Sequence, residues 1–353
     1  MGNRDVAMAT DTTGRAQVGR HDRWPGESAL PDRLGGGVVT FDCSVAVIAG
    51  GLSFEREVSL RSGQRVADAL RERGYRVSEL DADHRLVETL GTGEFDVAFL
   101  ALHGRFGEDG TVASILELLG IPYTGSSFDA SRLAFDKLAA KSVLRRAGLF
   151  VPSAIPLTEG ALRELGVGAL LDRALDELGL PIVVKPNRGG SALGIRLVER
   201  PDQLPGALMA AFGYDDTVLL EQQVQGTELA LSVVDGLATL PAVEIRPKEG
   251  WYDFSARYTH GAADFRVPAN LDQATVDRCL EAAHAAHLAL GCRDISRVDA
   301  ILDPVGTCRI LEVNTGPGLT TTSLVPMAAD AAGLTFSDLA AHLTDRAIAR
   351  RPR

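Results

Sequence analysis

The chain has 353 residues, with 47 acidic side chains against 36 lysines and arginines and a formal net charge of −11. That negative charge argues against nonspecific binding to nucleic acid or to a membrane surface. Apolar residues make up 45% and charged residues 24%, as in ordinary globular proteins, and no apolar run approaches the roughly 20 residues that cross a bilayer. The length predicts two or three domains. Four cysteines without paired short spacing are typical of reduced thiols in the cytoplasm.

The first half of the chain predicts a parallel α/β domain behind a disordered extension. Residues 1–42 are polar, glycine-rich and aperiodic, and we expect no fixed structure there. Strands and helices then alternate, which predicts a parallel sheet with ligands at the carboxyl ends of its strands. Glu55 and His103 both follow such ends. The strands are expected over 44–49 and 95–102, and the helices over 57–73 and 111–119.

The second half predicts an α+β arrangement with short antiparallel strands. A basic helix over 137–147 precedes it, and an alanine-rich helix over 272–290 follows four short strands. Lys185 ends the first strand and precedes the glycine-rich loop 187–191, where a lysine and free backbone N–H groups suit phosphate. The order of a P-loop is absent, so a structural turn explains this loop equally well when it is taken alone. The strands are expected over 180–186, 194–198, 217–221 and 228–234.

Two apolar runs near the C-terminus, 296–302 and 307–313, flank the turn Asp303-Pro304-Val305-Gly306 and predict a β-hairpin. Because side chains alternate between the faces of a strand, the polar residues of both runs fall on one face. These residues are Arg297, Asp299, Glu312 and Asn314.

An even-numbered turn would place Asp299 opposite Ile310 and Arg297 opposite Glu312. Carboxylate and amide oxygens are hard ligands, suited to Mg²⁺ that bridges the phosphates of a nucleotide. A solvated salt-bridge face is the alternative, but it requires neither Asn314 nor the glycine–proline turn that follows it.

Further motifs follow one another in a fixed order along the chain. They occupy residues 50–59, 101–110, 122–126, 185–186, 297–299, 312–315, 317–320 and 323–327. In these motifs, from about residue 45 to about residue 343, the chain resembles D-alanine–D-alanine ligases of the ATP-grasp superfamily.

The resemblance implies a three-part ATP-grasp architecture that combines α/β and α+β parts. The extension 1–42 would precede an N-terminal parallel α/β domain over 43–126, a central ATP-grasp lid domain over 127–226 and a C-terminal domain over 227–347 with the metal and substrate site. The implied reaction joins two D-alanine molecules with ATP, through an acyl phosphate, to D-alanyl-D-alanine for peptidoglycan of the cell wall. A cytoplasmic homodimer is implied, with ATP and D-alanine as its small-molecule partners and with no nucleic acid or membrane partner.

The resemblance also implies roles for particular residues. Lys137 and Lys185 would hold ATP phosphates, Gly190 would belong to a mobile lid loop, and Glu221 and Glu228 would receive the adenine and ribose edges. Two Mg²⁺ ions, with Mn²⁺ as an alternative, would bind Asp299, Glu312 and Asn314. Catalytic roles would fall to Glu55, Ser191, Tyr258, Arg297 and Gly318, and substrate contacts to His103, Ser323 and Leu324. A second lid would span 251–265.

Taken without the resemblance, three of these residues have simpler interpretations. Lys137 reads as a solvated helix lysine, Glu55 as a carboxylate at a helix start and His103 as a hydrogen-bonded histidine at a strand end.

The sequence departs from the family pattern at Arg257, Gly189, Ala192 and Gln222-Gln223, which puts lid dynamics and the preferred amino acid in question. Ligases for D-Ala–D-Lac, D-Ala–D-Ser or a secondary-metabolite dipeptide therefore remain alternatives, although Tyr258 argues against the depsipeptide version. A catalytically silent nucleotide-binding regulator is a further alternative, against which the complete metal set argues.

Overall fold

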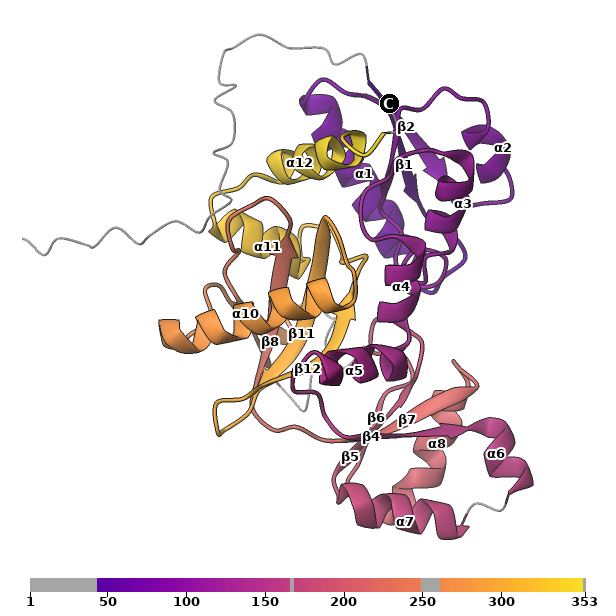
Figure 1. Cartoon of the computed structure of the whole chain (residues 1–353), viewed down its shortest axis with the longest axis vertical. Helices are drawn as coiled ribbons and strands as arrows, with labels where there is room; N and C mark the ends of the chain where they lie inside the picture. Colours follow the sequence, from indigo (N-terminus) through magenta and orange to yellow (C-terminus); the bar gives the residue numbers. More distant parts are fainter. Residues whose placement is uncertain (1–42, 166–167, 249–260, 352–353) are drawn as a thin grey trace, which may run out of the picture. The chain divides into compact units, whose positions relative to one another are not determined.

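The computed structural model describes residues 43–165, 168–248 and 261–351 (Figure 1). The predictions for the extension 1–42, for Tyr258 and Arg257, and for most of the second lid lie outside these residues. The described residues all belong to one compact unit. No helix in the described part of the chain is long and apolar enough to cross a membrane.

The N-terminal sheet is parallel, as predicted, with strand order β2-β1-β3. Helix α1 buries its small and apolar face, including Val66 and Leu70, in the same core as Val45 and Val47 of the central strand. Strand β2 was not predicted, because its residues alternate poorly and most remain partly exposed at the sheet edge. The elements are β1 (Ser44–Ala49), α1 (Arg56–Glu72), β2 (Arg76–Asp81), α2 (Leu86–Leu90), β3 (Val97–Leu100) and α3 (Thr111–Leu119).

The central sheet is antiparallel, with strand order β4-β7-β5-β6. Its apolar face, which includes Val184 and Leu220, packs against helices α7 and α8. Lys185 and Glu221 fall on the opposite face, because side chains alternate along each strand. The elements are β4 (Ala154–Thr158), α6 (Glu159–Glu164), α7 (Gly168–Leu178), β5 (Ile182–Pro186), β6 (Arg196–Val198), the 3₁₀ turn η1 (Pro201–Gln203), α8 (Leu204–Phe212) and β7 (Thr217–Gln222).

The C-terminal sheet is also antiparallel, with strand order β10-β9-β8-β11-β12. Figure 1 shows α10 and α5 on one side of it, where apolar residues of α4, α5, α10, β8, β11 and β12 share one core. Residues of α11, α12, α1 and β1 share a core with the other face. The elements are α4 (Phe128–Phe135), α5 (Lys137–Arg146), β8 (Thr227–Val234), β9 (Val243–Pro247), β10 (Ala263–Arg266), α10 (Gln273–Ala289), β11 (Ile295–Leu302), β12 (Cys308–Asn314), α11 (Leu324–Ala331) and α12 (Phe336–Ile348). The domain boundaries given above stay predictions.

The β11–β12 hairpin is present, but its predicted register was wrong. Leu302 pairs with Cys308, so an odd number of residues lies between the strands and Ala300, not Asp299, lies opposite Ile310. An irregularity between Asp299 and Ala300 then leaves Leu311 without a partner on β11 and shifts the pairing by one further position. Asp299 therefore lies opposite Glu312, and Arg297 opposite Asn314. The four polar side chains still share one face, and the two carboxylates are now directly opposite.

Candidate active site

Several segments that are distant in the sequence line a cavity of about 710 Å³. They are the segment from Glu55 through α1, the residues after β3, Ser191 of the glycine-rich loop, the paired ends of β11 and β12, the loop 318–324 and the start of α12. The cavity therefore brings together side chains as far apart in the sequence as Glu55 and Ser337. Predicted site residues among its lining are Glu55, His103, Ser191, Arg297, Asn314, Gly318, Ser323 and Leu324.

Glu55 joins the N-terminal part to the glycine-rich loop of the central part. Its backbone caps α1, its side chain is 8% exposed, and the Ser191 hydroxyl donates a hydrogen bond to its carboxylate. A Cβ atom on Gly190 would lie 3.1 Å from Glu55 Oε2 and 3.2 Å from Glu108 Oε2, so a glycine permits this close approach. The loop thus covers the two carboxylates.

His103 is buried and neutral. Burial lowers the pKa of its imidazole, although the nearby Glu55 carboxylate opposes the shift. Its Nδ1 atom lies 3.0 Å from the carbonyl oxygen of Gly316, which only accepts, so we assign the proton to Nδ1. The Ser62 hydroxyl then donates to Nε2 at 2.9 Å. These bonds tie β3 and α1 to the loop beyond β12.

Arg297 forms a two-pronged ion pair with Asp299. Nε and Nη2 of the guanidinium lie 2.6 and 2.8 Å from the two carboxylate oxygens. Burial by itself disfavours the charge, but Asp299, Glu312 and Glu108 outweigh it and raise the pKa of Arg297. The site therefore holds a permanent cation inside the cavity.

The three predicted metal ligands present oxygen atoms from two neighbouring strands. Lys137 Nζ lies 3.3 Å from Glu312 Oε2, and the Gly316 N–H donates to Asn314 Oδ1 at 2.8 Å. Two carboxylates and an amide oxygen, each now held by a cation or an N–H group, form a donor set that fits Mg²⁺.

The predicted nucleotide residues fall into two groups. At the start of α5, Lys137 Nζ donates to the carbonyl oxygen of Gly189 at 2.7 Å, which ties the helix to the glycine-rich loop. On the central sheet, Lys185 Nζ lies 2.6 Å from Glu221 Oε1, so this lysine and this glutamate bind each other. Glu228 is half-buried near the start of β8.

Two buried ionisable residues were missed. Glu108 lies 3.5 Å from Asn314 Nδ2, and burial, together with repulsion from Glu55 and Glu312, raises its pKa to about 8. Lys141 lies 2.6 Å from Glu221 Oε2. A signal for Lys141 existed, since it is four residues after Lys137 and so on the same helix face. The position of Glu108 within a motif carried no indication of its burial.

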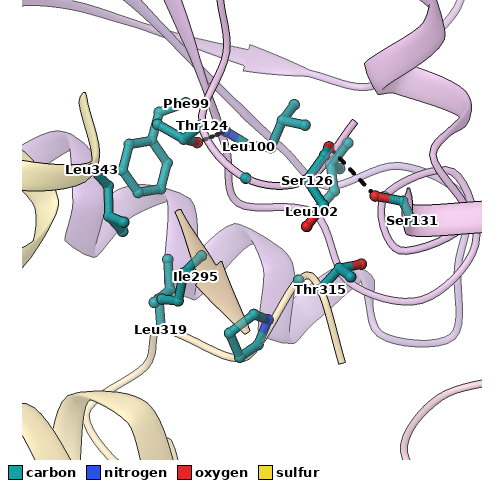
Figure 2. A pocket seen from close by; sticks show the side chains of 14 residues that line it. Phe99, Leu100, Leu102, Thr124, Ser126, Ser131, Ile295, Thr315, Leu319 and Leu343 are labelled. Carbon is teal, nitrogen blue, oxygen red and sulfur yellow. Dashed lines mark hydrogen bonds between the residues drawn. The ribbon is translucent and has the colours of Figure 1, made fainter. Parts of the chain in front are cut away.

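A second, smaller cavity of about 40 Å³ lies behind the loop 315–319 (Figure 2). Figure 2 shows Phe99, Ile295, Leu319 and Leu343 on its apolar side, with Thr315 nearby. Its volume is that of about one or two waters. Because neighbouring residues of one loop line both cavities, the packing here supports the backbone of Gly316 and Gly318.

Comparisons with known proteins agree with this geometry. Residues 143–345 match the family model for the D-ala D-ala ligase C-terminus, and residues 80–126 match that for the D-ala D-ala ligase N-terminus. The chain is 45% identical over 303 residues to the D-alanine–D-alanine ligase of Anaeromyxobacter sp. (strain K), covering 86% of this chain and 96% of that protein. The Geobacter sulfurreducens enzyme of the same name is 44% identical over 296 residues, 84% and 91% of the two chains.

Solved structures of related ligases share the fold of this chain. The D-alanine–D-alanine ligase of Bacillus anthracis complexed with ATP superposes with a TM-score of 0.76 at 34% identity, covering 88% of this chain and 98% of that one. The VanG D-Ala:D-Ser ligase of Enterococcus faecalis gives 0.74 at 29% identity, with 86% and 99% covered.

Proposed function

Because the chain belongs to the D-alanine–D-alanine ligase family, with its ATP-grasp fold, we propose that it joins two D-alanine molecules into D-alanyl-D-alanine. It is an ATP-dependent, ADP-forming ligase, and an acyl phosphate of the first D-alanine is the intermediate. The observation that carries the proposal is one cavity in which the Glu55–Ser191 pair meets the buried cation Arg297 and the face that bears Asn314.

The substrate end of the cavity suits two amino acids. Glu55 offers a carboxylate to the ammonium group of the first D-alanine. Arg297 and the N–H of Gly318 stabilise the oxyanion that forms when the second amine attacks. Ser323 and the first N–H groups of α11, from Leu324 on, receive the second carboxylate, because a helix start favours anions. Because His103 is neutral, it adds no second positive charge that would repel the incoming amine.

The residues assigned to the nucleotide are not among the lining of this cavity, and we propose that they bind ATP next to it, since Lys137 contacts both Glu312 and Gly189. Lys137 and Lys185 bind phosphate oxygens, with Gly190 in the loop above them, and Glu221 and Glu228 lie toward the adenine and ribose. Two Mg²⁺ ions, or Mn²⁺ in their place, would bind Asp299, Glu312 and Asn314. When bound, these ions neutralise charge on the β- and γ-phosphates.

Water has to be kept from the acyl phosphate, since that group hydrolyses easily. The loop 187–191 is fixed at its middle by the Lys137–Gly189 hydrogen bond and at its end by the Ser191–Glu55 hydrogen bond. Such contacts support a role for this loop as a lid. Tyr258, which the resemblance places in a second lid, lies outside the described residues.

The wider assignments follow from the reaction. D-Alanyl-D-alanine serves peptidoglycan synthesis and so cell shape, and its substrates are found in the cytoplasm. A homodimer is part of the same proposal, and sedimentation equilibrium of the full chain measures it.

Phosphate release from ATP, with the product weighed by mass spectrometry, tests the proposal. The full chain is offered D-alanine alone, then D-alanine with D-serine, D-lactate or L-alanine, with and without Mg²⁺. We expect D-alanyl-D-alanine with ADP from about pH 6 to about pH 9, and little depsipeptide when D-lactate is added. Dominant D-Ala–D-Lac near pH 6 or dominant D-Ala–D-Ser would overturn the assigned substrate, and ATP binding without turnover would identify a silent regulator.

A further inference from the structure

A cluster of three buried charges lies on the polar face of the central sheet. Lys185 from β5 and Lys141 from α5 each place Nζ 2.6 Å from a different carboxylate oxygen of Glu221 on β7. The three residues are 5%, 1% and 3% exposed, respectively. The Lys141–Glu221 contact is short but poorly aligned for a hydrogen bond, so we describe it as an ion pair.

The cluster holds one more cation than its anion needs. Burying charges is unfavourable unless they are paired, and a single lysine would already neutralise Glu221. Burial lowers the pKa of Lys141 to about 8, with Lys185 adding to the shift and Glu221 opposing it. Burial alone would raise the pKa of Glu221, but its two lysines hold it below the usual range. Lys141 and Glu221 are therefore mainly charged near neutral pH.

The two lysines of α5 face different partners. Lys137 contacts Gly189 O and Glu312, whereas Lys141, one helical turn later, contacts Glu221. Lys185 is the last residue but one of β5 and so lies just before the glycine-rich loop in the sequence. A phosphate bound to Lys185 competes with Glu221 for the single positive charge of this ammonium group, because a lysine has three N–H donors but one charge.

We propose that Lys141 is a positioning residue that keeps Glu221 neutralised when Lys185 turns from this carboxylate to the phosphates of ATP. Without Lys141, that movement would leave a buried carboxylate with no partner cation, which is strongly unfavourable. Glu221 would then retain Lys185 and compete with the nucleotide. The inference rests on the proposed role of Lys185 as a phosphate ligand.

The test is a double-mutant cycle of Lys141→Met and Glu221→Gln, measured in the full-length chain. In the wild-type background, Lys141→Met is expected to raise the KM for ATP about tenfold and to change kcat at saturating ATP much less. In the Glu221→Gln background, the same substitution is expected to change the KM less than about twofold, because no carboxylate is left to retain Lys185. Arg200→Met, at an exposed ion pair with Asp202, is the control.

Lys141→Arg keeps the charge and covers the case in which Lys141→Met does not fold. The charged groups that act on Lys141 are Glu221 on β7, Lys185 on β5 and Arg145 on α5 itself. Between about pH 7 and about pH 9 the wild-type lysine loses its proton, so we expect the KM for ATP to rise; an arginine stays charged, so the rise is absent in Lys141→Arg.

An unchanged KM in Lys141→Met, a KM change of equal size in the Glu221→Gln background, or the same pH profile in Lys141→Arg would each overturn the inference. So would a lowered melting temperature as the sole effect, since that marks a purely structural ion pair. Equilibrium binding of ATP without D-alanine gives a second readout. If the variants change this affinity as expected but no dipeptide forms, the proposed function fails while the role of Lys141 stands.

Discussion

Glu312 lies between charged residues from two different elements, α5 and β11. Lys137 from α5 lies 3.3 Å from its carboxylate, and Asp299 lies opposite it across the hairpin. A carboxylate held between a cation and a second carboxylate is poised to exchange the lysine for a divalent ion. The role of Glu312 therefore depends on its negative charge, which a glutamine of the same volume lacks.

We expect Glu312→Gln to lower ATP turnover by at least about 100-fold, on the order of 3 kcal/mol, because the volume is kept while a charged ligand is lost. Steady-state phosphate release at saturating Mg²⁺ measures it, with circular dichroism to confirm the fold. Glu281→Gln, at an exposed position of α10, is the control and should turn over normally. Turnover of the Glu312 variant within about twofold of wild type would remove this residue from the metal site.

Gly318 is a second position of the site at which a single added carbon atom is expected to change activity. A Cβ atom there would lie 2.7 Å from Ser323 Oγ, which is bonded to Thr320. We expect Gly318→Ala to displace Ser323 and to raise the KM for D-alanine about tenfold, or about 1.4 kcal/mol. Kinetics with varied D-alanine measure this change. In Gly206→Ala, on α8 with open space around it, kinetics should not change; equal effects in both variants would refute the steric argument.

At the scale of elements, Asp235 joins the end of β8 to three neighbours. It accepts the Asp294 N–H at 2.8 Å, and it lies 3.4 Å from His287 of α10 and 3.3 Å from Arg346 of α12. The contact with His287 is the largest of the effects that lower the pKa of Asp235 to about 2. The ends of these elements are thus held by one carboxylate.

A depressed pKa in the folded state means that the stabilisation is complete above the unfolded value near 4 and is lost as the pH falls toward 2. The shift corresponds to about 2 kcal/mol. At neutral pH we expect the free energy of unfolding of the wild type to exceed that of Asp235→Asn by this amount. The difference between the two proteins is expected to disappear as the pH falls below about 4. Urea unfolding at several pH values measures it. The exposed pair variant Asp202→Asn should show no such gap, and a gap that widens in acid would contradict the assignment.

At the scale of the whole molecule, Asp294 connects distant segments of the chain. Its fully buried carboxylate accepts a hydrogen bond from the N–H of Gly125 at 2.9 Å. It also forms ion pairs with Arg346 and Arg350 near the C-terminal end of the chain. The segment before β11, the end of the N-terminal part and α12 therefore meet at one side chain.

We expect Asp294→Asn to lower the free energy of unfolding by about 3 kcal/mol, because two partly buried arginines lose the fully buried anion that they contact. Asparagine tolerates the left-handed backbone found here, φ 63°, so the change isolates the charge. Denaturant unfolding measures the loss. Glu159→Gln, which breaks an exposed pair on α6, should stay within about 0.5 kcal/mol of wild type, and a similarly small loss at Asp294 would show that this junction is not needed for stability.

Regular elements and their faces were predictable from local patterns. The helix over 111–119 was predicted at its observed bounds, and the polar face of the hairpin was confirmed, because periodicity is a property of neighbouring residues. Strand β2 was missed because its pattern is weak at an exposed edge. The register was wrong because the turn leaves an odd number of residues between the strands and because a local irregularity accommodates Leu311. No spacing rule in the sequence indicates such an irregularity.

By itself the sequence determined which chemical groups are present and which of them share a strand or helix face, since alternation and helical periodicity act over a few residues. It also placed Glu55 and His103 at strand ends. Only the tertiary structure decided that Lys141 and Lys185 share Glu221, and that Glu108 is buried beside Asn314. These contacts join segments 36 to 206 positions apart. Burial and charge pairing depend on which distant segments pack together, and that packing is settled by the free energy of the whole fold rather than by any local pattern.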